Sequence, residues 1–311
     1  MFDLPAIKSP ENSRIKAVAK LRRQRLRRRT GLFTAEGLRQ VSRGMQAGLT
    51  FQEGFVCPEL VREADKPAVR SLLASTTSSE ITCFEGPPAA FAGATGRPRE
   101  GVNRWFCVPE SLMRRIAYRQ NPQGILTVFE QPNWDLNKIE DRVTRAAAQD
   151  SPPAPELWLV TVGTSKPGNL GAMVRSAAAA GANGVMVADA VVDPFNANAV
   201  RASTCAVFTM PVVVDASTPI LSFLERRNVR IVTANPGAQT CYTQINLRGP
   251  LAFVVGSEHE GLPPIWTEAT GAEPVRIPMA GEVVDSLNAS TSAAVLLFEV
   301  VRQRQERCGR V

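Results

Sequence analysis

The sequence has 311 residues, of which 44% are hydrophobic and 21% are charged. That is enough apolar material for a sizeable core, which excludes a globally disordered chain, and the length predicts about two domains. No apolar run reaches the ~18 residues that a membrane-spanning helix needs. The start, MFDLPAIKSP, lacks the apolar stretch of a signal peptide, so we expect a cytoplasmic protein.

The cysteines argue against both a metal site and a disulfide framework. Six cysteines lie far apart without a C-x-x-C spacing, and the chain has one histidine. A zinc cluster would have almost no ligands to draw on. We therefore expect no metal, and interpret the cysteines as small hydrophobic residues.

The positive charge is concentrated near the N-terminus. The net charge is +7, and residues 1–30 hold ten Lys or Arg against two acids. The stretch 14–29 predicts one amphipathic helix that begins after Asn12 or Ser13 and ends at Gly31. Nine cations without an acid repel one another unless a polyanion is bound, which favours nucleic acid over a membrane surface or an acidic protein partner. The candidate RNA-binding residues are Arg14, Lys16, Lys20, Arg22, Arg23 and Arg27.

The first 130 residues predict a small α/β domain. Strands are expected at 31–37, 54–57, 80–84 and 124–130, and helices near 37–48, 66–74 and 110–118. Residues 86–104 are interpreted as a loop insertion. Residues 131–156 end in the proline-rich SPPAP and predict a linker, so the domains are 1–130 and 157–311.

Residues 157–311 predict a parallel sheet, because their apolar runs are continuous rather than alternating. Strands are expected at 157–163, 184–189, 212–214, 229–234, 251–256 and 275–278. A long helix is expected from about 288 to 306.

Three segments of this second domain carry polar residues at turns. The first, KPGNLGAMVR, contains Asn169 and Arg175 and opens a helix, but it is neither a dinucleotide fingerprint nor a Walker loop. Taken alone, it favours a helix-capping Asn169 and a surface Arg175. The second, VVGSEHEGL, places Glu258 at the carboxyl end of a strand, and we interpret His259 as a solvated loop residue.

The third segment, IPMAGEVVDSLNAS, precedes the last helix. Its Ser286 or Asn288 is of the type that caps a helix N-terminus. Each of the three segments is weakly informative by itself.

In this order, however, the three segments resemble the SpoU/TrmH branch of the SPOUT RNA methyltransferases. The resemblance extends to S-x3-S-R-I-K, L-R-R-Q-R-L-R-R-R-T-G-L-F-T-A-E-G-L-R and N-P-Q-G-I-L, which are similar to that branch's ribosomal-protein-like RNA-binding domain. It covers residues 9 to about 300 without the 86–104 insertion.

The resemblance implies a C-terminal parallel sheet with a deep trefoil knot, a homodimer, and methyl transfer from S-adenosylmethionine (AdoMet) to a ribose 2′-hydroxyl. Ribosomal RNA (23S type) is favoured over tRNA, and an RNA-binding protein that has lost catalysis is the alternative. A third interpretation, a nucleotide-dependent oxidoreductase, is not supported, because the sequence lacks a dinucleotide-binding fingerprint. By resemblance the cofactor-binding residues are Gly256, Ile277, Met279 and Leu287, and the catalytic residues are Arg175, Asn169, Glu258, Ser286 and Asn288.

The resemblance assigns the proton-accepting role to Arg175. Since a guanidinium is not deprotonated in proteins, we prefer that Arg175 binds the adjacent phosphate and stabilises the developing alkoxide. The loop between Ile277 and Leu287 is one residue longer than the family pattern, which predicts a bulge beside Ser286 and Leu287.

Overall fold

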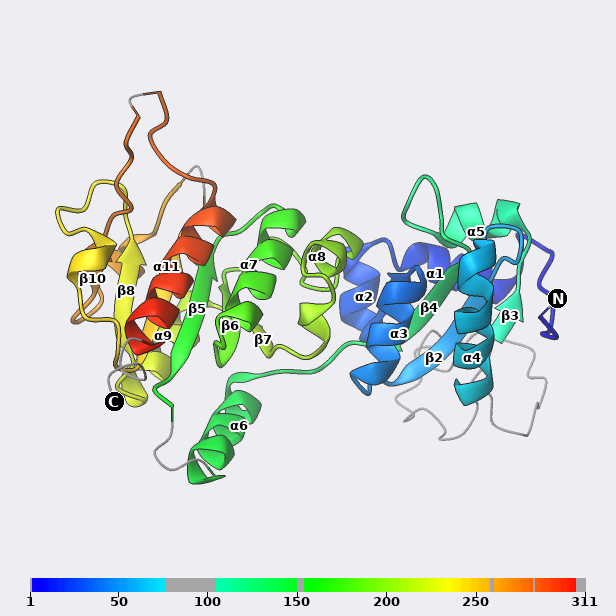
Figure 1. The fold of residues 1–311 in the computed structure, drawn as a ribbon, viewed down its shortest axis with the longest axis horizontal. Coiled ribbons are helices and arrows are strands. Elements are labelled where there is room, and N and C mark those ends of the chain that lie inside the picture. Colours follow the sequence, from blue (N-terminus) through cyan, green and yellow to red (C-terminus); the bar gives the residue numbers. More distant parts are fainter. Residues whose placement is uncertain (1, 77–104, 150–153, 258–259, 282, 306–311) are drawn as a thin grey trace. The chain divides into compact units, whose positions relative to one another are not determined.

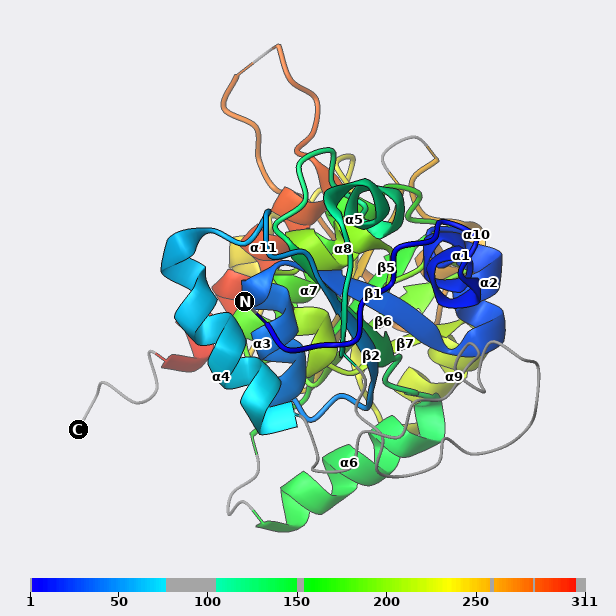
Figure 2. The ribbon, with the colours of Figure 1, turned by 90° about the vertical axis from the view of Figure 1, so that its right-hand side faces the viewer.

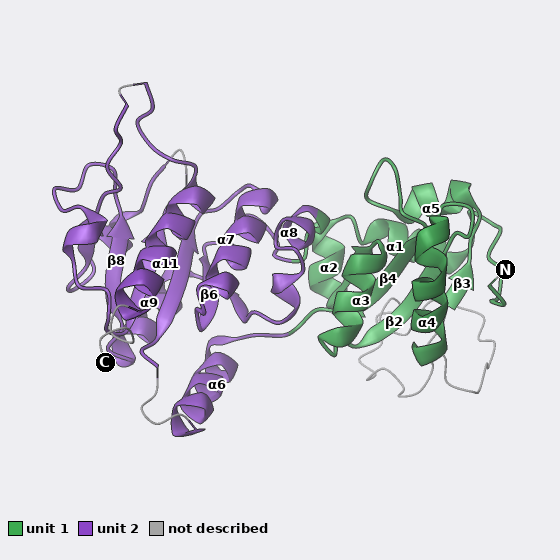
Figure 3. Ribbon diagram, in the orientation of Figure 1, with its two compact units in different colours: residues 1–132, 195–197 green, residues 133–194, 198–311 purple. Residues whose placement is uncertain are grey.

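A computed structural model describes residues 2–76, 105–149, 154–257, 260–281 and 283–305 (Figure 1). The chain divides into two compact units (Figure 3). Unit 1 comprises residues 1–132 and 195–197, and unit 2 comprises residues 133–194 and 198–311. The expected strand at 80–84 and the expected insertion at 86–104 lie outside the described residues.

Unit 1 is built on a four-stranded sheet. Its strands are β1 (Leu32–Glu36), β2 (Phe51–Val56), β3 (Trp105–Cys107) and β4 (Ile125–Glu130). The spatial order is β1-β4-β2-β3, with β4 antiparallel to both of its neighbours and β3 parallel to β2. The sequence did not predict β3, which has three residues and no alternation to reveal it.

Helices cover both faces of this sheet. They are α1 (Ser13–Lys20), α2 (Gln24–Thr30), α3 (Leu38–Gln46), the 3-10 turn η1 (Glu63–Asp65), α4 (Lys66–Thr76) and α5 (Glu110–Ile116). Apolar side chains of α1 and α5 form one core with the sheet, and those of α3 and α4 form a second core with it. The ribbon in Figure 2 shows α3 and α4 on one side of this sheet and α1 on the other. The small α/β domain that the sequence predicts is confirmed.

The basic segment forms two helices, so the prediction of one continuous helix was wrong. α1 ends at Lys20 and α2 begins at Gln24. Between them, the Nη1 atom of buried Arg27 donates hydrogen bonds to the carbonyl oxygens of Leu21 (2.7 Å) and Arg22 (2.9 Å). A side chain thereby replaces the helical partners of these carbonyls, and the break leaves them satisfied.

The predicted ends of the basic segment are confirmed. The Oδ1 atom of Asn12 accepts a hydrogen bond from the backbone N–H of Arg14 (2.9 Å), as an N-cap does. Gly31 follows α2 with a φ of 65°, the left-handed conformation that commonly ends a helix at glycine.

Unit 2 contains a six-stranded sheet in which every pairing is parallel, as predicted. Its strands are β5 (Leu157–Val162), β6 (Gly184–Ala188), β7 (Val212–Asp215), β8 (Arg230–Ala234), β9 (Leu251–Val255) and β10 (Glu273–Val275). The spatial order is β10-β8-β9-β5-β6-β7. The last strand ends at Val275 rather than Pro278, so Ile277 lies in the loop beyond it. The trefoil knot stays a prediction.

Two layers of helices enclose this sheet. The helical elements are α6 (Leu136–Gln149), α7 (Pro167–Ala179), α8 (Ala197–Ala202), η3 (Ala206–Phe208), α9 (Ser217–Arg226), η4 (Tyr242–Gln244), α10 (Pro264–Thr267) and α11 (Ala289–Gln305). On one face α7 and α11 lie side by side (Figure 1). A core on the sheet includes buried residues of α6, α9 and α10.

The segment expected to be a linker contributes to this core. Ile139 and Val143 of α6 are buried against the strands of unit 2. Residues 133–149 therefore belong to the fold of unit 2. The predicted first domain, residues 1–130, corresponds to most of unit 1, whose main stretch ends at residue 132. The apolar positions of α6 are what separate it from a solvated connection.

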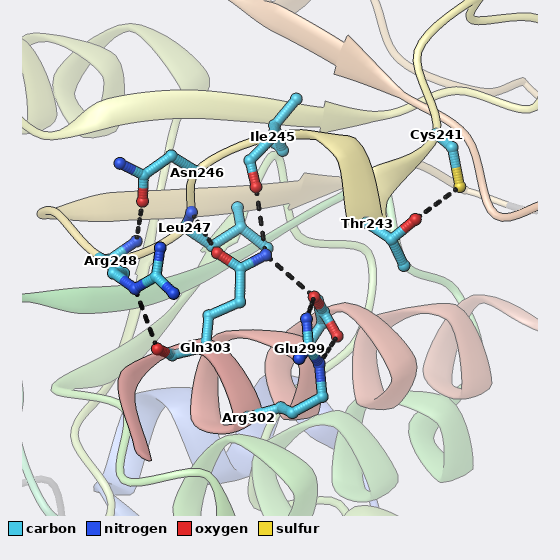
Figure 4. A network of polar contacts seen from close by, with 9 residues as sticks. All are labelled: Cys241, Thr243, Ile245, Asn246, Leu247, Arg248, Glu299, Arg302 and Gln303. Carbon is cyan, nitrogen blue, oxygen red and sulfur yellow. Dashed lines mark hydrogen bonds and ion pairs between the residues drawn. The ribbon is translucent and has the colours of Figure 1, made fainter. Parts of the chain in front are cut away.

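Helix α11 is fastened to the loop that precedes β9 (Figure 4). The buried side chain of Gln303 accepts a hydrogen bond from the N–H of Leu247 (2.9 Å) and donates to the carbonyl of Ile245 (3.1 Å). Its amide also donates to Glu299 (2.9 Å), which pairs with Arg302 (2.7 Å). This α11 clamp holds the start of β9 in place.

Candidate functional site

The site is built on the turn that follows β9. Gly256 is needed there, because a Cβ at this position would lie 2.3 Å from the carbonyl oxygen of Gly261. The turn closes on itself through a hydrogen bond from the N–H of Gly261 to the carbonyl of Ser257 (3.2 Å). Gly261 itself has a φ of 67°, which favours glycine. Two glycines therefore allow the two sides of this turn to approach each other closely.

A first cavity of about 180 Å³ lies beside this turn, at the carboxyl edge of the sheet. It lies beyond β8, β9 and β10, where open parallel sheets hold ligands. The structure places all four predicted cofactor residues and Ser286 in its wall: Gly256, Ile277, Met279, Leu287 and Ser286. Its lining mixes apolar side chains with amide, hydroxyl and carboxylate groups, as a pocket for a partly polar ligand requires.

Sequence reasoning missed several residues of the first cavity. Asn235 and Pro236 follow β8, Ser292 lies in the first turn of α11, and Asp285 precedes Ser286. Asn235 and Pro236 could have been found from their place directly after a predicted buried strand. Only its position next to the predicted residue Ser286 could have indicated Asp285, because the loop that carries it has no periodic sequence pattern.

A second cavity of about 200 Å³ shares Gly256, Ser257 and Ala289 with the first. Asn169 and Lys166 also line it, at the start of α7. Because Ala289 begins α11, two helix N-termini border this cavity, and both contribute positive partial charge. The second cavity therefore suits a polar or anionic group next to the ligand of the first.

Asn288 connects the two helix starts. Its Oδ1 atom accepts a hydrogen bond from the N–H of Ser290 (3.0 Å), so it is the N-cap of α11. Its Nδ2 atom donates to Oδ1 of Asn169 (3.3 Å). The same side chain therefore caps α11 and contacts Asn169, although Asn288 itself lines neither cavity.

Arg175 lies apart from these residues. It is exposed on α7 and lines neither cavity. Six residues separate it from Asn169, a rise of about 9 Å along the helix. The described residues therefore do not bring Arg175 together with the other predicted catalytic residues. Glu258 and His259 lie outside the described residues.

Two of the predicted RNA-binding cations are structural, and their assignment was wrong. The Nη1 atom of Arg14 lies 2.7 Å from Oε2 of Glu53, and both side chains are buried. The guanidinium of Arg14 also lies 5.0 Å from the centre of the Phe106 ring. Arg27 is buried and bonds to backbone carbonyls, as described above. Neither cation is placed to meet a phosphate.

The other cations of this segment lie at the surface. Lys16 forms an ion pair with Glu11, and Arg22 donates to the carbonyl oxygens of Arg114 (3.5 Å) and Ala117. Lys20 and Arg23 are exposed, and their binding of RNA stays a prediction. Three further exposed arginines of the same run were omitted from the prediction: Arg25, Arg28 and Arg29.

Within the described ranges, no group of three or more His, Cys, Asp or Glu residues is arranged to hold a metal ion. None of the helices described there is long and apolar enough to cross a bilayer. The described cysteines 57, 107, 205 and 241 are free thiols.

Comparisons with known proteins agree with the division of the chain into two units. Residues 156–298 match the model of the SpoU rRNA methylase family, and residues 12–127 match an MRM3-like substrate binding domain. The 23S rRNA (guanosine-2′-O-)-methyltransferase RlmB of Ralstonia nicotianae is 36% identical over 194 residues, which cover 62% of this chain and 74% of that protein. The chain belongs to the SpoU rRNA methylase family.

Two further similarities bear on how far the SpoU assignment extends. An uncharacterized tRNA/rRNA methyltransferase of Mycobacterium ulcerans is 37% identical over 64% of this chain, and the match spans 62% of that relative's length. The crystal structure of the SpoU methyltransferase AviRb from Streptomyces viridochromogenes in complex with AdoMet is 25% identical. It covers 96% of this chain and 100% of that one, with a TM-score of 0.74. The structural similarity to AviRb thus includes residues of both units.

Proposed function

We propose that this protein transfers a methyl group from AdoMet to a ribose 2′-hydroxyl of RNA in the cytoplasm, with 23S-type ribosomal RNA favoured over tRNA. The observation that carries the proposal is the pair of joined cavities at the carboxyl edge of the unit 2 sheet. The first is lined by the four predicted cofactor residues, and the second by Asn169. The names of RlmB and AviRb support the reaction and the cofactor.

The residues of the first cavity suit AdoMet. Ile277, Leu287 and Met279 offer apolar contacts for an adenine ring, and Asp285 offers a carboxylate for a cationic group. The backbone at Gly256 lies close to that of Gly261, because Gly256 has no side chain, and both line this cavity. AdoMet, when bound, supplies a methyl group on a sulfonium, which is already a strong electrophile.

The protein's own task is then to orient the 2′-oxygen and to assist the loss of its proton. We assign orientation to Asn169 and Asn288, whose amides are joined at the second cavity. Helix N-termini at the same place favour the nearby phosphate and the developing oxyanion. Glu258 and Ser286 are assigned to holding these groups, by resemblance.

Arg175 is assigned to the phosphate next to the target ribose, where its charge would stabilise the alkoxide. Its exposure outside both cavities fits the homodimer that the resemblance implies, with the active site near the subunit interface. A guanidinium can bind phosphate through two parallel hydrogen bonds, which lysine cannot do. Arg175→Lys should therefore lose most of the turnover, and near-normal turnover would contradict this role.

The deciding experiment incubates the protein with total RNA and methyl-labelled AdoMet, and then digests the sized RNA to nucleosides. We expect label in a 2′-O-methylnucleoside of 23S rRNA. Arg175→Ala should abolish it, whereas Arg226→Ala, an exposed arginine on α9, should not. Label on a base would overturn the ribose assignment, and label in tRNA would overturn the preferred substrate.

Binding measurements separate the remaining outcomes. If AdoMet does not bind, the methyltransferase proposal is wrong. If AdoMet and ribosomal RNA both bind but no label appears, the alternative of an RNA-binding protein that has lost catalysis is favoured.

A further inference from the structure

The loop that joins α5 to β4 in unit 1 is fixed by a buried carboxylate. Glu36, at the end of β1, is 6% exposed, and its Oε2 atom accepts hydrogen bonds from the N–H groups of Tyr118 (2.8 Å) and Arg119 (3.1 Å). Its Oε1 atom is buried without a hydrogen-bond partner among the described residues. Burying a carboxylate oxygen without a hydrogen bond reduces the stability of the fold. Locally unfavourable features of this kind are typical of functional sites.

The other end of this loop is equally constrained. Gly37 has a φ of 91°, and a Cβ there would lie 2.1 Å from Oε1 of Gln123. Gly124 has a φ of 74°, and its carbonyl accepts a hydrogen bond from the N–H of Cys57 (2.8 Å). The start of α3 is therefore pressed against the loop, and the backbone of residues 118–124 is held at both ends.

This fixed loop presents an aromatic ring to solvent. Tyr118 is 42% exposed, although its backbone is held by Glu36. A rigid backbone under an exposed ring reduces the entropy that the ring loses when a flat partner stacks on it. A flat π-surface of this kind is what unpaired nucleotide bases stack on in RNA-binding proteins.

Arginines are concentrated on the elements that meet at the loop. Arg22 reaches from the segment between α1 and α2 to the carbonyl of Ala117, the residue before Tyr118. The other arginines on these elements are Arg39 of α3, Arg114 and Arg115 of α5, and Arg119 of the loop.

Few acids offset these charges. Glu110 pairs with Arg114 (2.6 Å), and Glu36 is buried under the loop. Glu11, which pairs with Lys16, also acts on Arg115. The elements that meet at Tyr118 still carry more arginines than acids, and this excess suits a phosphate backbone. Basic side chains beside an aromatic ring are the combination that holds single-stranded nucleic acid.

We propose that Tyr118 is a stacking platform for an unpaired base of the RNA substrate, with arginines of the elements that meet at the loop binding the phosphates on either side. This inference rests on the proposed function in that its ligand is RNA. It adds that the substrate carries an unpaired nucleotide, which unit 1 recognises independently of methyl transfer.

The test measures RNA affinity of the full chain without AdoMet, so that it is independent of catalysis. Two probes are compared, an RNA hairpin with an unpaired loop and a perfectly paired duplex with the same number of nucleotides. Tyr118→Ala should weaken hairpin binding by about 5- to 100-fold, the usual effect of losing one stacked base. Duplex binding should not change, because phosphate contacts remain. Tyr118→Phe keeps the ring and should retain hairpin affinity.

Tyr242→Ala is the matched control, since it removes the chain's other tyrosine, in unit 2. It should leave both affinities unchanged. Equal losses for hairpin and duplex with Tyr118→Ala, or no loss at all, would overturn the proposal.

A second measurement uses the unaltered protein, so it does not depend on the folding of a variant. The hairpin carries 5-iodouridine in its loop, and irradiation crosslinks it to a stacked aromatic ring. The crosslinked peptide should contain Tyr118. A crosslink confined to other peptides would contradict the stacking platform.

Discussion

At the scale of single residues, the turn after β9 depends on the absence of a side chain at position 256. A Cβ there would meet the carbonyl of Gly261 at 2.3 Å, so Gly256→Ala must open the turn that lines both cavities. Strain of about 1–3 kcal/mol corresponds to roughly 5- to 150-fold weaker AdoMet binding. Calorimetric titration measures this directly.

Gly249→Ala is the control for this substitution, because nothing lies within 4 Å of a Cβ at that position. It should bind AdoMet as the unaltered protein does. Equal affinities for the two variants would show that the turn tolerates a methyl group and that Gly256 has no special role.

The thiols differ in reactivity for local reasons. A hydrogen bond with the Thr243 hydroxyl (3.2 Å), helped by the charge of Arg276, lowers the pKa of Cys241. Burial raises the pKa of Cys57 to about 12. Since the thiolate is the reactive form, iodoacetamide should modify Cys241 at a lower pH than an ordinary thiol, and should leave Cys57 unmodified at neutral pH.

Peptide mass spectrometry over a pH series follows this order of modification. Thr243→Val removes the hydroxyl and should move the onset for Cys241 to higher pH. Modification of Cys57 as fast as that of Cys241 would contradict the assignment.

At the scale of elements, the α11 clamp stabilises unit 2. Gln303→Ala would leave the buried N–H of Leu247 and the carbonyl of Ile245 without their side-chain partner. We expect the free energy of unfolding to fall by about 1–3 kcal/mol, the usual cost of unsatisfied buried groups. Urea denaturation measures it, with the exposed Gln305→Ala on the same helix as control. An equal effect of the two substitutions would argue against the clamp.

The elements themselves were predictable where a local pattern fixes them. Strands β5, β6 and β9 of unit 2 were found because each is a continuous apolar run buried on both faces. The break between α1 and α2 could not be predicted, because apolar residues continue at helical spacing through Leu21 and Leu26. Arg27 satisfies the carbonyls at the break, and Arg14 meets Glu53 from 39 residues away. Such tertiary contacts leave no mark in the local sequence.

The candidate site was predictable to a similar extent. Glycine turns after buried strands indicated Gly256, and the resemblance supplied Ile277, Met279 and Leu287, which share one cavity. The distance of Arg175 from that cavity could not be inferred from spacing, because it depends on the direction in which α7 leaves the sheet.

At the scale of the whole molecule, binding of RNA should depend on salt through the exposed cations. Each phosphate contact that is lost reduces the slope of log affinity against log salt by about 1. Arg28→Ala and Arg29→Ala, both exposed on α2, should each reduce the slope in this way. Dissociation constants for ribosomal RNA over a salt series provide the measurement.

Arg14→Ala is informative as a contrast. Its loss removes the cation that pairs with buried Glu53, so it should destabilise unit 1 rather than change the salt slope. A slope unchanged in both α2 variants would contradict phosphate binding by this helix.

The strand order of unit 2 also governs how a newly synthesised chain acquires its parts. β5 is among the first strands of its sheet to be made, yet it pairs with β9, which follows three other strands in the sequence. The walls of the first cavity extend to Ser292. A ribosome must therefore release almost the entire chain before this cavity can exist, whereas the sheet of unit 1 is complete once Glu130 has emerged. Truncated products of interrupted translation would accordingly carry a folded unit 1 without the first cavity of unit 2.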